Sequence, residues 1–165
     1  MRKLLLIGAL VAILVLPTVV FAESKSVEVS YTVNPGYTLT IPAELRLVTT
    51  NPIPKVVSVT DVRIASNEIL TVTMESKNFT GDSKNGYHVK YDGDSIIPYT
   101  VKMGETTADT KVSRNNIELI SIVSGVESKS LYMTFSTTDK DVANSTKAGK
   151  HVDTLTFTAE VSVRK

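Results

Sequence analysis

The chain has 165 residues, a formal net charge of +1 and 21% charged residues, and it contains no cysteine. This near-neutral balance gives no electrostatic reason to expect binding to nucleic acid or to an anionic membrane. The absence of cysteine excludes disulfides and a lipid-modified N-terminal cysteine. The stability of the fold therefore has to come from an apolar core and from strand pairing.

The first 22 residues have the parts of a secretory signal peptide. Arg2 and Lys3 supply a positive start, the stretch from Leu4 to Leu16 is apolar, and small residues precede a cleavage point after Ala22. The alternative is an uncleaved anchor, but about 13 apolar residues are short for a span of about 20. We predict a bacterial protein that is secreted or displayed at the cell surface, with no membrane span after removal of the signal peptide.

The residues directly after this segment alternate between polar and apolar. Val27, Val29, Tyr31 and Val33 occupy every second position, as expected for a strand with one apolar face. Such a strand can pair within its own domain or add to the sheet of another subunit, where main-chain hydrogen bonds supply affinity. The same pattern serves both, so the choice stays open, although we favour self-pairing.

The same period of two continues to the end of the chain. Further alternating runs are Tyr37-Leu39-Ile41, Val57-Val59, Val62-Ile64, Leu70-Val72-Met74, Tyr87-Val89-Tyr91, Tyr99-Val101-Met103, Ile120-Ile122, Leu131-Met133-Phe135 and Leu155-Phe157-Ala159-Val161-Val163. The phase changes between Val59 and Val62, which predicts a slip within that strand. Each run is typical of a half-buried strand.

Turn signals separate these runs. Asn34-Pro35-Gly36 divides the first two, Pro42, Pro52 and Pro54 mark a connection outside any central strand, and Asp92-Gly93-Asp94 predicts a hairpin turn. The other polar segments are 78–86, 104–116, 124–125 and 137–150, the last with one helical turn near Asp139 to Ala143. We expect residues 104–116 to form a loop because they show no periodicity.

About nine or ten short strands without a long helical pattern predict a sandwich or a barrel. Long cross-connections favour an open sandwich over a closed barrel. We therefore predict an all-β fold, an antiparallel, immunoglobulin-like sandwich in which residues 23–165 form a single domain.

The two histidines are the first candidates for chemistry. His88 is out of phase with Val89, so we expect it on the polar face of its strand, and we expect His151 to open the last strand. No G-x-S-x-G or H-E-x-x-H motif accompanies either residue. The sequence therefore predicts no enzymatic activity and no cofactor.

Two pairs of carboxylates are the next candidates. Asp92 and Asp94, and Asp139 and Asp141, place alternating acidic oxygens on turns, an arrangement that can bind Ca²⁺. Each pair offers only two carboxylates and neither matches an EF-hand, so we interpret both as turn residues and predict no metal site. A sugar-binding platform is also disfavoured because tryptophan is absent, and the six tyrosines are expected mostly in the core.

Both ends of the predicted domain resemble known families. Residues 26–35, S-V-E-V-S-Y-T-V-N-P, resemble the N-terminal extension of colonisation-factor type fimbrial subunits. Residues 148–157 are similar to the end strand of pilin-like domains, including the spore coat protein U type, through Gly149, His151, Asp153, Leu155 and Phe157. Residues 37–42, Y-T-L-T-I-P, are similar to a motif of small secreted proteins of Gram-positive bacteria.

The resemblance implies a pilin-like fold with a role at the cell surface. This sequence departs from the resemblance at two points. His151 stands where those families usually have tyrosine, and the chain has no cysteine, whereas chaperone-assembled pilins commonly have a disulfide. We predict a non-catalytic structural or adhesive protein whose partners are identical or related subunits or a ligand on a host or cell surface. A stand-alone module that binds a glycan or Ca²⁺ is the alternative.

Overall fold

The computed structural model describes residues 28, 30, 32–81, 86–93 and 95–164. The chain divides into two compact units, Met1–Thr32 and Val33–Lys165, and all strands described below belong to the second. The predicted signal peptide lies outside the described residues, as do Val27, Val29 and Tyr31 of the predicted pairing strand. Val33 is 61% exposed and precedes the first strand.

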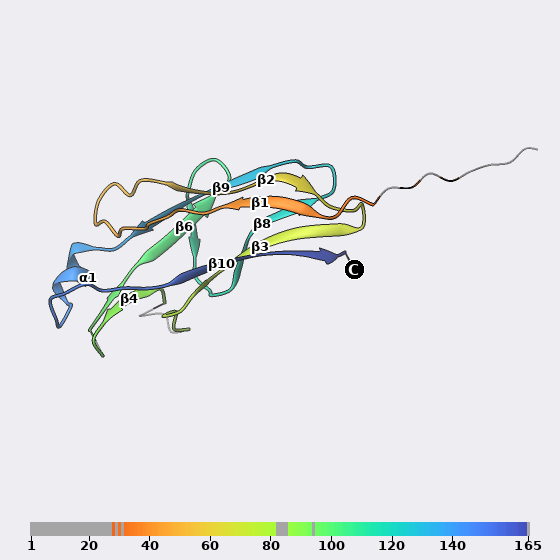
Figure 1. Ribbon diagram of the computed structural model, residues 1–165. Helices are drawn as coiled ribbons and strands as arrows, with labels where there is room; N and C mark the ends of the chain where they lie inside the picture. Colours follow the sequence, from red (N-terminus) through yellow and green to blue (C-terminus); the bar gives the residue numbers. More distant parts are fainter. Residues whose placement is uncertain (1–27, 29, 31, 82–85, 94, 165) are drawn as a thin grey trace, which may run out of the picture. The chain divides into compact units, whose positions relative to one another are not determined.

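The described part of the second unit contains ten strands and one short helix, drawn in Figure 1. They are β1 (Gly36–Thr40), β2 (Lys55–Arg63), β3 (Glu68–Ser76), β4 (His88–Tyr91), β5 (Ser95–Pro98), β6 (Thr100–Gly104), β7 (Thr110–Val112), β8 (Ile117–Val123), β9 (Lys129–Ser136), α1 (Asp139–Ala143) and β10 (Leu155–Val163). All pairs of these strands are antiparallel. The prediction of an all-β class with antiparallel sheets is confirmed.

The strands form three sheets. Five strands are ordered β1-β2-β9-β6-β7, three are ordered β10-β3-β8, and β4 and β5 form a separate two-stranded sheet. One cluster of buried apolar side chains contains residues from both larger sheets, among them Val57, Val59, Leu70, Val72, Met74, Val101, Ile120, Ile122, Leu131 and Met133. These are the in-phase residues of the alternating runs, so the period of two identifies the core-facing side of each strand.

A bulge near the end of β2 accounts for the change of phase in its sequence. Val57 and Val59 are buried, whereas the next half-buried apolar residue is Val62, on the other parity. Between them Asp61 has a φ of 56°, and the pairing of β1 with β2 shifts register there. The extra residue changes which alternate side chains face the core, so Val62 is half-buried although its parity differs from that of Val59. The predicted slip is confirmed.

Two local predictions are confirmed and one is wrong. Asp92 and Gly93 have positive φ in the turn between β4 and β5, and the helical turn is α1. Residues 104–116, however, include β7, which pairs with β6 at the edge of the five-stranded sheet. This strand has only three residues, and only one of them, Val112, is buried, so it carries no periodic signal.

Candidate functional site

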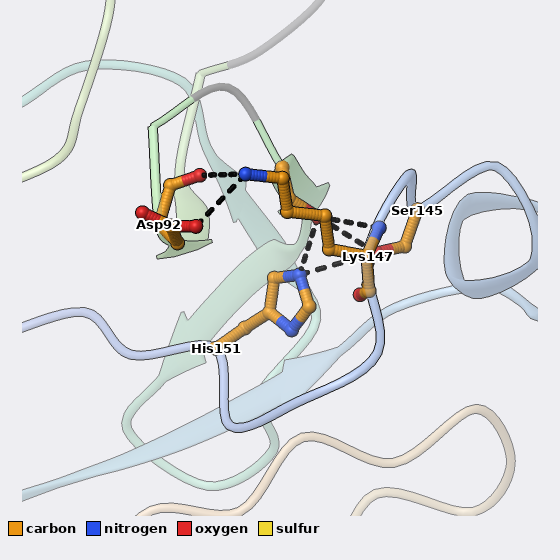
Figure 2. Close-up of polar contacts among 5 residues, drawn as sticks. Asp92, Ser145, Lys147 and His151 are labelled. Atoms are coloured by element: carbon orange, nitrogen blue, oxygen red, sulfur yellow. Dashed lines mark hydrogen bonds and ion pairs between the residues drawn. The ribbon is translucent and has the colours of Figure 1, made fainter.

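The connection that leads from α1 to β10 packs against the β4–β5 hairpin (Figure 2). Ser95 is fully buried, and its hydroxyl lies 2.9 Å from Nε2 of His151 and 3.0 Å from Oγ of Ser145. The backbone N–H of Lys147 also donates to Ser95 Oγ, at 3.2 Å. One hairpin residue thus gathers three residues of the connection, 50 or more positions later in the sequence.

The hydrogen-bond roles of His151 follow from its second nitrogen. Nδ1 lies 3.1 Å from the carbonyl of Gly149, which only accepts, so Nδ1 carries a hydrogen. In this tautomer Nε2 accepts from the hydroxyl of Ser95. The Oγ of Ser145 lies 3.1 Å from the same nitrogen, so the hairpin and the connection meet at this ring.

An ion pair closes the outer side of this cluster. Nζ of Lys147 contacts both the carboxylate and the carbonyl oxygen of Asp92, as Figure 2 shows. The distances are 2.9 Å to Oδ2 and 3.1 Å to the carbonyl oxygen. Both side chains are about half exposed or more, at 48% and 72%. Exposed pairs of this kind contribute about 0–1 kcal/mol, so the contacts of Ser95 should matter more for stability.

Two serines lie beside His151. Ser95 is fully buried, so no substrate carbonyl can approach its hydroxyl in this conformation, whereas Ser145, with its Oγ 3.1 Å from Nε2, is half-buried. The ring is oriented by the carbonyl of Gly149. Sequence reasoning missed Ser95 and Ser145 because neither has a motif around it, and only the fold brings them together.

Gly149 approaches the ring of Tyr91 more closely than any other residue type allows. Its φ is 144°, and an added Cβ would lie 2.8 Å from Tyr91 Cζ. We expect Gly149→Ala to lower the free energy of unfolding by about 1–3 kcal/mol through backbone strain and collision. Urea denaturation followed by circular dichroism measures this change.

Gly125→Ala is the matched control because Gly125 also has a positive φ, 90°, but meets no atom within 4 Å. It reports the backbone strain alone. Equal losses in the two variants would show that the contact with Tyr91 contributes nothing.

A second polar cluster fixes the point where the chain enters β10. Oδ2 of Asp153 accepts from the hydroxyls of Tyr99 at 2.6 Å and Ser76 at 2.7 Å. Its Oδ1 accepts from the backbone N–H groups of Asn78 at 3.2 Å and Thr154 at 2.7 Å. Asp153 therefore ties the start of β10 to the end of β3 and to the residue between β5 and β6.

Burial raises the pKa of both tyrosines in this region. Loss of hydration, with a smaller contribution from the negative charge of Asp153, raises the pKa of Tyr87 to about 12. Loss of hydration and then the hydrogen bond to Asp153 raise the pKa of Tyr99 far above its ordinary value. Both hydroxyls act as donors, Tyr87 to the carbonyl of Arg114 at 2.7 Å, and both therefore stay protonated.

The predicted positions of both histidines are wrong. His88 is only 5% exposed. It is the first residue of β4, and the preceding Tyr87 lies in a bend and is also buried. Two successive side chains therefore point inward. His151 lies four residues before β10, because the neighbouring Val152 pairs with Lys90 of β4 and not with β3. The chain crosses to β3 only after that bridge.

The prediction for the tyrosines is right only in part. Tyr87 and Tyr99 are buried, whereas Tyr37 and Tyr91 are 39% and 37% exposed. The other two residues of the end-strand motif, Leu155 and Phe157, are half-buried in β10 and pack against the core.

The two pairs of carboxylates have structural roles where the structure describes them. Asp92 binds Lys147, and Asp141 binds the hydroxyl of Thr138, the N-cap of α1. Asp139 is exposed, and Asp94 is outside the described residues. In the described part of the chain no group of three or more His, Cys, Asp and Glu side chains could hold a metal ion.

The outer edge of β10 is the longest open strand edge among the described residues. Nine consecutive pairs join β10 to β3, and no other described strand pairs with its opposite side. A side chain of β1 reaches that side: the hydroxyl of Tyr37 donates to the carbonyl of Ala159 at 3.0 Å. Since the N–H and C=O of one strand residue point the same way, the odd-numbered residues of β10 face the open edge.

The described part of the chain also contains a pocket of about 220 Å³ beside the N-terminal end of α1. It lies between the start of β4, the β5–β6 junction, the end of β7 and the end of β9. Hydroxyl-bearing and aromatic residues make up much of its wall.

These features define the chain as an all-β protein of antiparallel sheets, with polar clusters that fix its last strand. No family model, no curated protein and no solved structure matches the sequence or the fold. Among the described residues, no helix has the length and apolar character required to cross a membrane.

Proposed function

We propose that this chain is a secreted, non-catalytic structural or adhesive surface protein with an immunoglobulin-like, pilin-like sandwich. Removal of residues 1–22 as a signal peptide is part of the proposal, and its support is the sequence pattern of that segment. The protein assembles with identical or related subunits by strand addition. The open edge of β10 is the observation on which this proposal rests.

The β10 edge has the properties that strand addition needs. It extends over nine residues, from Leu155 to Val163, and contains no proline. Unpaired main-chain groups along such an edge supply hydrogen bonds to an added strand. Its core-facing residues Leu155, Phe157, Ala159 and Val161 are only half-buried, so an added strand with alternating apolar side chains would cover them further.

The alternating segment after the proposed cleavage point is the donor that fits this edge. It presents Val27, Val29, Tyr31 and Val33 at every second position, the spacing that matches the row along β10. The Tyr37 hydroxyl donates a hydrogen bond to the carbonyl of Ala159, at the middle of the edge, so an added strand has to displace this hydroxyl.

Proline at position 159 tests this assembly. Ala159→Pro removes an outward N–H while leaving the β3 ladder intact, so we expect association to be lost and the unfolding temperature to change little. Thr158→Pro is the matched control, because the N–H of Thr158 points toward β3 and its loss should destabilise the fold. Sedimentation velocity over a range of concentrations, on protein made with its complete N-terminal sequence, measures association.

Tyr37→Phe provides the opposite change. It frees the carbonyl of Ala159, and we expect association at lower protein concentration than in the parent protein. A parent protein and a Tyr37→Phe variant that both stay monomeric at all concentrations would refute strand addition through β10.

A further inference from the structure

Three aromatic residues, Phe79, Tyr87 and Tyr99, line the pocket beside α1 and are called its aromatic floor. Phe79 is half-buried and packs edge-on against Tyr87, with ring centroids 4.9 Å apart, and Tyr87 lies 5.6 Å from Tyr99. The two tyrosine hydroxyls already donate to Arg114 and Asp153. Tyr87 and Tyr99 are only 3% and 8% exposed, so Phe79 offers most of the ring carbon that a ligand can reach.

Three hydroxyl groups of the pocket wall form no side-chain hydrogen bond with another described residue. They belong to Thr100, Ser113 and Ser136. The neighbouring hydroxyl of Thr137 is used differently, since it donates to the carbonyl of Pro98 at 2.7 Å and holds the wall together. Three groups from three different strands or strand ends thus remain to pair with a ligand.

The described residues that line the pocket include one positive and one negative side chain. They are Lys111 and Asp141. Oδ2 of Asp141 accepts from Thr138 at 2.6 Å, which leaves Oδ1 to accept from a ligand. A ligand with a strong net charge of either sign would meet one of these groups as a repulsive neighbour. A purely apolar ligand would cover the three hydroxyls without pairing them, which is costly.

From the aromatic floor, the unpaired hydroxyls and the balanced charges, we propose that this pocket binds a neutral, polyhydroxylated ligand with the size of one sugar ring. The C–H face of such a ring packs on the aromatic floor, and its hydroxyls pair with Thr100, Ser113, Ser136 and Asp141. At about 220 Å³ the pocket is smaller than the sites of drug-sized ligands, which begin at about 300 Å³. A monosaccharide or the terminal sugar of a glycan has the required chemistry.

This site is distinct from the β10 edge, since none of the residues that line the pocket belongs to β10. The two proposals can therefore fail separately. The Ala159→Pro variant, in which association is expected to be lost, should keep the sugar site.

Titration of the full chain with methyl glycosides of several hexoses and N-acetylhexosamines tests the proposal. We expect chemical-shift changes in the amides of Thr100, Ser113 and Ser136 and saturable binding in two-dimensional NMR. A glycan array then separates a free sugar from the end of a glycan. Glycine betaine serves as the zwitterionic probe, and octyl alcohol as the apolar one.

The double variant Ser113→Ala/Ser136→Ala should bind about 5- to 150-fold more weakly, because each lost hydrogen bond is worth about 0.5–1.5 kcal/mol. Ser162→Ala is the matched control, since Ser162 is exposed on β10. Both variants should keep the parent unfolding temperature.

Three outcomes would overturn the proposal. The first is no shift at the pocket with any glycoside up to about 50 mM, well above millimolar affinity. The second is binding of betaine or octyl alcohol in preference to every sugar. The third is equal affinity of the double variant and the parent.

Discussion

Asp153→Ala should lower the free energy of unfolding by about 3–5 kcal/mol, the largest loss we expect from one polar substitution in this protein. The carboxylate accepts four hydrogen bonds, two from the hydroxyls of Tyr99 and Ser76 and two from backbone N–H groups. Tyr99 and Ser76 are 8% and 2% exposed, so water cannot replace the lost acceptor without a rearrangement. Each donor left unpaired in such a site costs about 1–3 kcal/mol.

Chemical denaturation of the variant, the parent and Asp139→Ala measures this loss. Asp139 is exposed on α1, so its substitution should change stability by less than about 0.5 kcal/mol. A double-mutant cycle with Tyr99→Phe gives the coupling between Asp153 and the tyrosine hydroxyl, and we expect a coupling above about 1 kcal/mol. A loss below about 1 kcal/mol for Asp153→Ala would mean that the cluster does not anchor β10.

Local patterns in the sequence were enough to locate most strands and several of their irregularities. The period of two identified the buried residues of β3 and β9, because a strand in a half-buried sheet alternates whatever its partner is. The phase change before Val62 located the bulge near Asp61, and Asp92-Gly93 located the β4–β5 turn. Each of these signals is contained within a few residues.

Contacts between distant segments were beyond such patterns. Ser95 and His151 are 56 positions apart, and no spacing rule relates them. The alternation around His88 predicted the wrong face because a bend at Tyr87 lets two successive side chains point inward. The aromatic residues and hydroxyls of the pocket come from five separate segments, so only the packed fold brings them together.

Among these long-range contacts, the buried tyrosines have a measurable pH dependence. Burial raises the pKa of Tyr87 to about 12 from its ordinary value of 10.0, and it raises the pKa of Tyr99 further. In the unfolded chain both hydroxyls ionise near pH 10, whereas in the folded protein they keep their protons. Above that pH the unfolded state therefore binds fewer protons, and the stability falls as the pH rises.

We expect the urea midpoint to be steady near pH 8 and to fall steeply from about pH 10 to about pH 12, because each such tyrosine contributes a slope of up to about 1.4 kcal/mol per pH unit. Tyr87→Phe and Tyr99→Phe should each flatten this alkaline fall. Tyr99→Phe should also be less stable at neutral pH, because Asp153 loses a donor. Tyr132→Phe removes a half-buried hydroxyl outside this network and serves as the control.

The two tyrosine variants and the control separate burial from general alkaline effects. General alkaline effects weaken any protein, but they act equally in the parent and in all three variants. If Tyr87→Phe and Tyr99→Phe fall as steeply as the parent, the two hydroxyls are not protected from water in solution. The aromatic floor of the pocket would then be more open than the structure shows, since Tyr87 and Tyr99 form part of it.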